Sequence, residues 1–401
     1  MTQSNTDQQT APADGADNGQ LAPAALAARA VALADHGSAP RTAAAVLAGA
    51  ASAGTLPVWV RPAEPRRRTW LSRLTHFAAW CVTLGLLVVA ALRIGYHDAT
   101  VLLIWLNSFT LYIYLPAYVI LAVAVRRQHW LLAAASAAVV LCHLIWVARD
   151  FRPATPYQPP SVASASSRPI RILYANLRAS NRDFDGILGE ISQADPDVVV
   201  LVEVDRGWFD VLKPSPVMKP FVHGTALAEP FMGEVMVCSK LPVSGHQRTW
   251  IVGRVCNLVD ISLDGRTLRL FCLHSPRPNV TSPDAYRVYW EKITPLLAEQ
   301  PKPLVVIGDF NATQYSLAYQ RLASLGLRSA HVDRGRGYAT TWPNGQHLVP
   351  PIRIDHALVS PDVECLDIAA GVGLGSDHKP LVLDVRVHSS GTPTLGAASG
   401  G

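Results

Sequence analysis

Three long runs without a charged residue follow one another between residues 74 and 148, and they restrict the fold more than any other feature of the chain. The runs cover residues 74–92, 99–125 and 130–148. Each is long enough to cross a hydrocarbon layer about 30 Å thick as a helix. Charged residues make up 16% of the chain, below the value of about a quarter that is typical of soluble proteins. We therefore predict three transmembrane helices, the middle one kinked at Pro116, and a lipid bilayer as a partner. Buried helices of a soluble protein are the alternative.

The distribution of arginines predicts how these helices are oriented. Five arginines precede the first run within residues 61–73, and Arg126 and Arg127 separate the second run from the third. Arg93 is the only arginine between the first run and the second. Since cytoplasmic loops collect Lys and Arg, we expect a multi-pass protein of the plasma membrane with a cytoplasmic N-terminus. Everything after the third run then lies outside the cytoplasm, although Arg149 and Arg152, just after that run, oppose this orientation.

The rest of the chain divides by composition into segments of different kinds. Residues 1–60 contain few large apolar residues, which predicts disorder. After the membrane region of residues 61–150, residues 151–168 are rich in Pro and Ser and predict a linker. A globular pattern covers residues 169–387, and the small residues of 388–401 predict a disordered tail.

Within the globular segment, apolar and β-branched stretches alternate with turns and with helical patterns. The stretches are IRILYANL, DVVVLVEV, EVMVCSKL, NLVDISL, LRLFCLHS, PLVVIGDF, IDHALVS and LVLDVRV. The helical candidates FDGILGEISQA and DAYRVYWEKITPLLAEQ lie between some of them. This mixture indicates an α/β fold with two packed mixed sheets and outer helices, which is a four-layer α/β/β/α sandwich.

Polar residues collect at the ends of these apolar strands. A charged group at the end of a buried strand is costly unless it is paired or binds a metal, so a set of them points to a function rather than to packing. Carboxylate and amide oxygens suit Mg²⁺, which bridges to phosphate oxygens, and a His held by an Asp can position or deprotonate a water. The pattern therefore favours metal-assisted cleavage of a phosphate ester. The residues are Asn176, Glu203, His274, Asp309, Asn311, Asp355, His356, Asp377 and His378.

Residues 170–386 resemble the endonuclease/exonuclease/phosphatase superfamily. The matching motifs follow in the family's order, and SDHKP after GDFN is the most specific pair. Ser239-Lys240-Leu241-Pro242 departs from the family's Ser-Arg-x-Pro by a lysine. The motifs are YANLRASN, ADPDVVVLVEVD, MGEVMVCSKLPV, LHSPRP, GDFNAT, RIDHALVS and SDHKPLV.

This resemblance implies a role for each matching residue. Glu203 corresponds to the principal metal ligand, with Asn176 beside it and Asp377 completing the site. The implied cofactor is Mg²⁺, with Mn²⁺ as an alternative. The implied enzyme is therefore a metal-dependent phosphatase or phosphodiesterase.

The same resemblance implies the catalytic residues. Asp309 orients or activates the attacking water, and Asn311 holds a phosphate oxygen. Alternation along the strand places these two side chains on one face. His378 contacts the scissile phosphate and is oriented by Asp355. His274 is a further phosphate contact, with a structural histidine as the alternative.

The substrate is less constrained than the chemistry. Residues 150–401 carry 24 Lys and Arg against 24 Asp and Glu, and this balance disfavours nucleic acid, which normally recruits a basic surface. The arrangement of spans and domain resembles the membrane-bound vancomycin/teicoplanin-resistance proteins of actinobacteria. That resemblance implies dephosphorylation of a polyprenyl pyrophosphate, undecaprenyl pyrophosphate, and through it resistance to glycopeptide antibiotics. A membrane-anchored extracellular nuclease or other phosphodiesterase is the first alternative, and a non-catalytic sensor that binds a ligand is the second.

Overall fold

The computed structural model describes residues 70–158, 167–225, 235–278, 283–346 and 348–388. The predicted disorder of residues 1–60, half of the predicted linker and nearly all of the predicted tail lie outside these residues. All described residues belong to one compact unit, Thr69–Gly401.

Two of the three apolar runs form single long helices. The first gives α3 (Trp70–Tyr96), and the third gives α7 (Trp130–Val147), which continues into the short 3₁₀ helix η1 (Ala148–Phe151). Both are long and apolar enough to cross a membrane. Their outward faces carry exposed large apolar side chains, such as Phe77 and Leu141, which is typical of helices that face lipid.

The middle run differs from the predicted kinked span. It breaks into α4 (Val101–Ser108), α5 (Thr110–Ile113) and α6 (Leu115–Arg126), with a bend of 68° after α4. Three spans are therefore possible only if the bent pair counts as one, so the prediction of three is not confirmed.

The break has a local cause, and it lies before the proline. The hydroxyls of Ser108 and Thr110 donate to the carbonyls of Ile104 and Asn107, and such bonds compete with the helix. Pro116 lies in the first turn of α6, where its missing N–H has no effect on the helical hydrogen bonds.

Within the described residues, twelve strands form two mixed sheets of six. The first sheet has the order β11 (Val363–Ala370), β12 (Leu381–Val387), β1 (Ile170–Asn176), β2 (Val198–Val202), β4 (Val235–Ser239), β3 (His223–Gly224). The second has the order β5 (Val243–Ile251), β6 (Arg254–Leu263), β7 (Arg266–His274), β8 (Leu304–Asp309), β10 (Asp355–Val359), β9 (Arg328–Ser329).

Each sheet contains one parallel pair, and the other neighbours are antiparallel. The parallel pairs are β1–β2 and β7–β8. Helix α8 (Phe184–Ala194) connects the first pair and α10 (Pro283–Ala298) the second, as parallel strands require a crossover. In this way each pair directs two carboxyl ends to the same edge of its sheet.

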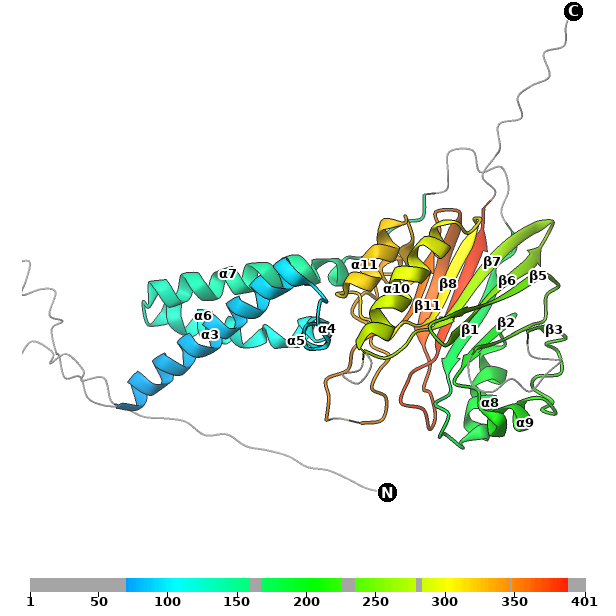
Figure 1. The fold of residues 1–401 in the computed structure, drawn as a ribbon, viewed down its shortest axis with the longest axis horizontal. Helices are drawn as coiled ribbons and strands as arrows, with labels where there is room; N and C mark the ends of the chain where they lie inside the picture. Colours follow the sequence, from blue (N-terminus) through cyan, green and yellow to red (C-terminus); the bar gives the residue numbers. More distant parts are fainter. Residues whose placement is uncertain (1–69, 159–166, 226–234, 279–282, 347, 389–401) are drawn as a thin grey trace, which may run out of the picture. The chain divides into compact units, whose positions relative to one another are not determined.

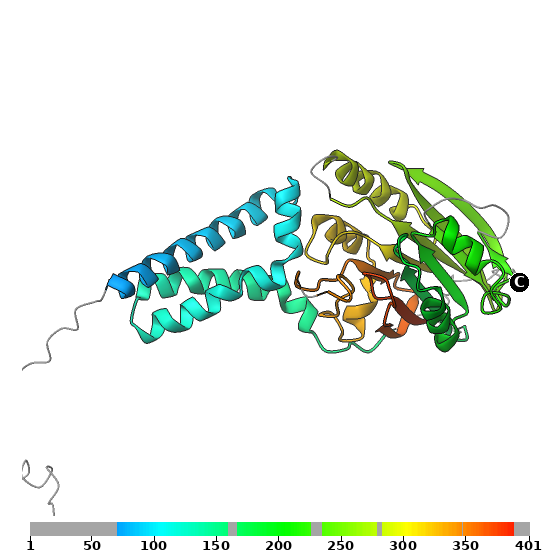
Figure 2. The same ribbon diagram turned by 90° about the horizontal axis from the view of Figure 1, so that it is seen from below.

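The sheets pack face to face, and helices cover their outer faces (Figures 1 and 2). Alternation along β1 shows the layering: Ile170, Ile172 and Tyr174 enter the core between the sheets, while Leu173 and Ala175 pack under α8 and α9 (Arg206–Leu212). Helices α10 and α11 (Leu317–Ser324) cover the second sheet, and the short α12 (Ala330–Asp333) contacts the ends of β10 and β11. The predicted four-layer sandwich of two mixed sheets with outer helices is confirmed.

Candidate active site

The strand order gathers the predicted polar residues at one edge of the sandwich. Asn176 ends β1, Glu203 follows β2, His274 ends β7 and Asp309 ends β8. The antiparallel strand β10 begins at the same edge, because Asp355 lies opposite Asp309 in the sheet register. All predicted site residues except Asp377 contact a neighbour within this group; the contacts follow below.

Glu203 and Asn176 form one side of the group. Glu203 has a left-handed backbone with φ of 57°, which is uncommon for a residue with a side chain. Its Oε2 accepts from the N–H of Ala179 at 3.1 Å, and its Oε1 accepts from Asn176 Nδ2 at 3.2 Å. Burial alone would raise the pKa of Glu203, but these hydrogen bonds and nearby positive charge, including that of Arg277, lower it below its usual value. Glu203 is therefore held as a carboxylate.

Asp309, Asp355 and His378 form the other side. His378 Nδ1 lies 2.8 Å from Asp355 Oδ2, and His378 Nε2 lies 3.8 Å from Asp309 Oδ2. Burial lowers the pKa of His378, but the charges of Asp355 and Asp309 outweigh it and raise that pKa to about 9. Burial and the neighbouring Asp355 raise the pKa of Asp309 to about 7. The group thus contains a protonated imidazole beside a carboxyl that exchanges its proton near neutrality.

Asn176 joins the two sides. Its Nδ2 donates to Asp309 Oδ2 at 3.1 Å as well as to Glu203 Oε1. Its backbone carbonyl accepts from the hydroxyl of Ser376 at 2.7 Å, and the same hydroxyl oxygen accepts from the N–H of His378. The residues of the two sheets are therefore held in one hydrogen-bonded network.

Asn311 reaches the site by a turn rather than by strand alternation. Its φ of 44° ends the extended backbone, and its N–H donates to Asp309 Oδ1 at 2.8 Å, as an Asp side chain commonly accepts two residues on. Asn311 Nδ2 donates to the carbonyl of Ser275 at 3.0 Å. Phe310 between them is fully buried in the outer core of the second sheet. The two polar residues lie together as expected, but for a different physical reason.

His274 is buried, and no hydrogen-bond partner reaches it among the described residues. Both of its ring nitrogens lack one, and its Nε2 lies 3.8 Å from Glu203 Oε1 and 3.7 Å from Asp309 Oδ2. Burial and the charge of Arg254 lower the pKa of His274 to about 3. The ring is neutral, so these contacts are not ion pairs. Buried polar groups are usually hydrogen-bonded, so the ring of His274 is free to contact a ligand of the site.

Asp377 lies beside the site and has other partners. Its Oδ2 accepts from Trp342 Nε1 at 3.3 Å, and its Oδ1 lies 3.8 Å from Arg178 Nε. It lines the same pocket as His378 and Asn311. No described contact joins it to Glu203, so its assignment as a metal ligand stays a prediction.

The donor set fits a hard divalent cation. Glu203 Oε1 and Asp309 Oδ2 both face the unpartnered His274 Nε2, and carboxylate and amide oxygens are the donors that Mg²⁺ prefers. Asp309, Asp355 and His378 also place ligand atoms within 4.8 Å of one another. In that second group the His378–Asp355 hydrogen bond already uses one atom from each of two residues. The oxygens of Glu203 and Asn176 are hydrogen-bonded as well, so the assignment of the cation to these two residues, which the family resemblance implies, stays a prediction.

Sequence reasoning missed two residues that complete the site. The buried Tyr174 donates from its hydroxyl to Asp355 Oδ1 at 2.8 Å. Its position two residues before Asn176, on the same face of β1, is a signal that could have identified it. Arg277 donates to Glu203 Oε1 at 3.2 Å and lies in the LHSPRP motif.

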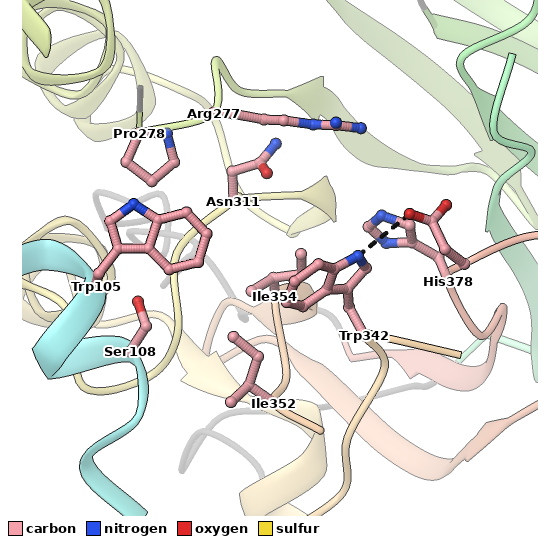
Figure 3. A pocket seen from close by; sticks show the side chains of 10 residues that line it. Trp105, Ser108, Arg277, Pro278, Asn311, Trp342, Ile352, Ile354 and His378 are labelled. Atoms are coloured by element: carbon pink, nitrogen blue, oxygen red, sulfur yellow. Dashed lines mark hydrogen bonds between the residues drawn. The ribbon is translucent and has the colours of Figure 1, made fainter. Parts of the chain in front are cut away.

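A pocket of about 400 Å³ opens at this edge (Figure 3). Arg277, Asn311 and His378 lie at its polar end, where Figure 3 shows them close to one another. Arg277 also lines a second, smaller pocket, which contains Glu203 and His274. Arg277 therefore lines both the hollow that contains His378 and the hollow that contains Glu203.

Comparison with known proteins agrees with the motifs. The sequence profile of the Endonuclease/Exonuclease/phosphatase family matches residues 173–378, just over half of the chain. No curated protein is significantly similar in sequence.

Several solved structures are similar at low identity. The endonuclease/exonuclease/phosphatase from Bacteroides vulgatus is 19% identical with a TM-score of 0.46, over 55% of this chain and 99% of that one. The human Nocturnin catalytic domain with bound sulfate is 19% identical with a TM-score of 0.44, over 58% and 99%. A mannosyl-6-phosphatase from Bacteroides thetaiotaomicron is 16% identical with a TM-score of 0.42, over 54% and 99%. On the match of its sequence to the family profile, this chain belongs to the Endonuclease/Exonuclease/phosphatase family.

Proposed function

We propose that the protein is a membrane-anchored, metal-dependent phosphoesterase whose active site lies outside the cytoplasm. Its proposed substrate is a lipid pyrophosphate of the cell envelope, with undecaprenyl pyrophosphate as the candidate. The main support for the proposal is that one group of polar residues lies at the ends of the strands, beside an open pocket. These residues are Asn176, Glu203, His274, Asp309 and the Asp355–His378 pair. We call this group the strand-end network. Members of the family are hydrolases of phosphate esters.

The proposed chemistry follows from the protonation of these groups. Asp309, with a pKa of about 7, accepts a proton from the attacking water at neutral pH. His378 carries a proton and is fixed by Asp355, so its Nε2 donates to a phosphate oxygen. Arg277 and Asn311 face the same pocket and supply positive charge and an amide to the phosphate. When bound by Glu203 and Asn176, Mg²⁺ would neutralise phosphate charge and polarise the ester.

Membrane anchoring is supported by the apolar helices. Helices α3 and α7 each satisfy the length and composition of a span, and the bent middle segment supplies a third if it crosses as one. Arginine placement favours a cytoplasmic N-terminus. With three crossings the catalytic domain lies outside the cytoplasm, where envelope lipid carriers are recycled.

The choice of a lipid carrier rests on this placement and on the resemblance to glycopeptide-resistance proteins. Regeneration of the carrier would support resistance to teicoplanin-type antibiotics. The balanced charge of residues 150–401 gives a nuclease no basic surface of the usual kind.

Two assays on the purified full chain with Mg²⁺ test the proposal. One measures phosphate release from undecaprenyl pyrophosphate, and the other measures nicking of a plasmid. We expect phosphate release without nicking, and loss of that release in Asp309→Ala and His378→Ala. Nicking without phosphate release would refute the lipid substrate and establish a nuclease. Inactivity in both assays would refute both substrates and favour another phosphodiester or a binding protein.

A further inference from the structure

The wall of the catalytic pocket is more apolar than a phosphate requires. Beside its polar residues, the pocket is lined by Trp105, Trp342, Ile352 and Ile354 (Figure 3). Trp105 belongs to α4, so the apolar helical region supplies part of the catalytic pocket. A phosphate group alone gains nothing from such a wall, whereas an attached hydrocarbon would.

A second groove continues from the same tryptophan. It has a volume of about 420 Å³, and Trp105 lines both hollows. The other lining residues are Leu102, Leu106, Phe109, Tyr112, Ile113, Leu348, Val349 and Pro350. Leu102 is 68% exposed and Leu348 is 94% exposed, so this apolar surface is open to a ligand. The hydroxyl of Tyr112 donates to the carbonyl of Pro351 at 2.6 Å and ties the two walls of the groove together.

Buried polar contacts fix α4 and its neighbours to the catalytic domain. Arg93, which is 5% exposed, donates to the carbonyl of Tyr315 at 3.0 Å. Asp98 Oδ2 accepts from the N–H of Leu317 at 2.6 Å, and Asp150 accepts from the hydroxyl of Tyr315. These partners lie a few residues after Asn311 in the chain. The apolar wall is therefore built into the site, and the helical region does more than anchor.

We propose that this continuous surface holds the hydrocarbon chain of the substrate, so that the site takes a phosphate ester of a long apolar alcohol. The phosphate occupies the end formed by Arg277, Asn311 and His378, and the chain passes over Trp105 into the groove between α4–α5 and residues 348–350. The inference rests on the proposed function, since it assumes that this pocket receives the phosphate. It adds the path of the substrate's hydrocarbon chain and the part that the helical region plays in binding it.

The test measures how affinity depends on chain length. Ethyl, butyl and octyl phosphonate are titrated by calorimetry into the full chain in lipid nanodiscs with Mg²⁺, with empty nanodiscs subtracted. A buried methylene raises affinity by about fourfold, so octyl phosphonate should bind at least about tenfold more tightly than ethyl phosphonate. Octanol should bind more weakly than octyl phosphonate, because the phosphate end contributes to the same site.

Variants of the groove give the discriminating result. Trp105→Ala should reduce the ratio of octyl to ethyl affinity toward one, and so should Leu348→Ser, whose side chain is too exposed to matter for folding. Trp250→Ala is the matched control, since Trp250 is an exposed tryptophan on β5 that lines neither hollow. Three results would overturn the inference. They are an octyl-to-ethyl affinity ratio of one in the wild type, an unchanged ratio in both groove variants, and octanol binding as tight as that of octyl phosphonate.

A parallel assay separates this inference from the proposed function. Phosphate release from short and long alkyl pyrophosphates is measured on the same samples. Release with no chain-length dependence of binding would refute the chain path and leave the phosphoesterase intact. Chain-length dependence without any release would support the path and refute the phosphoesterase.

Discussion

The hydrogen bond from Tyr174 to Asp355 supports His378 from inside the core, and its removal is a sharp test of the proposed site. Tyr174, Asp355 and His378 are all buried, with the hydroxyl 2.8 Å from Asp355 Oδ1 and His378 Nδ1 2.8 Å from Oδ2. Burial and the charge of Asp355 raise the pKa of Tyr174 well above its usual value. The tyrosine is therefore a permanent donor, and it stabilises Asp355 as the anion that holds His378.

The substitution Tyr174→Phe removes this donor and leaves the ring, so no cavity forms. Among the described residues no other donor reaches Asp355 Oδ1, which would be left unsatisfied in the core. A hydrogen bond to a charged group contributes about 1.5–3 kcal/mol, so we expect the free energy of unfolding to fall by about 2 kcal/mol. We expect phosphate release to slow about tenfold, because a barrier raised by about 1.4 kcal/mol has that effect.

Denaturant unfolding in detergent and phosphate release measure the two effects. Tyr157→Phe is the matched control, because the Tyr157 hydroxyl donates at 2.9 Å to the carbonyl of Pro361 at the surface. That control should lose less than about 0.5 kcal/mol and keep its rate. If Tyr174→Phe behaves like the control in both measurements, Asp355 does not depend on the buried hydroxyl and the reasoning is wrong.

Three further predictions concern the metal, the helical region and pH. Glu203→Gln should raise the Mg²⁺ concentration for half-maximal phosphate release at least about tenfold, and an unchanged Mg²⁺ dependence would exclude Glu203 as a ligand. Asp98→Ala should leave the part-buried N–H of Leu317 without its acceptor and lower the free energy of unfolding by about 0.5–1.5 kcal/mol, measured by thermal unfolding. An unchanged midpoint would contradict the coupling of the helices to the globular domain. Burial lowers the pKa of His331 well below its usual value of 6.5, so the unfolded chain binds a proton there that the folded chain does not. As the pH falls below 6.5, this residue should therefore lower the free energy of unfolding by up to about 1.4 kcal/mol for each pH unit. In His331→Gln the free energy of unfolding should depend less on pH over this range. An equal pH dependence in the wild type and the variant would refute the assignment.

The strands and the gathering of polar residues at their ends were predictable because both depend on local pattern. The alternation in IRILYAN separates Ile172 from Leu173 by face, and the structure places them in different cores. A charged residue at the end or start of a buried strand is costly unless it is paired, so Asp309 and Asp355 could be identified before their register was known.

Other features could not be predicted, because they depend on contacts between distant residues or on local bonds. The bend after Ser108 arises from hydroxyl–carbonyl hydrogen bonds, and the apolar composition of the run is the same with or without it. The left-handed turn at Asn311 leaves no trace in the strand pattern. The wall that Trp105 contributes beside His378 joins residues far apart in the chain, and no spacing in the sequence indicates it.

Metal-dependent phosphate release by the purified full chain, compared between the wild type and His378→Gln, tests the central claim most directly. The glutamine is close in volume, and near-UV circular dichroism verifies that the fold is retained. The site predicts release that requires Mg²⁺ and that falls about 10²–10⁴-fold in His378→Gln. Release that persists in a folded His378→Gln protein, or that proceeds equally without a divalent cation, would contradict the proposal that the strand-end network is a metal-assisted phosphoesterase centre.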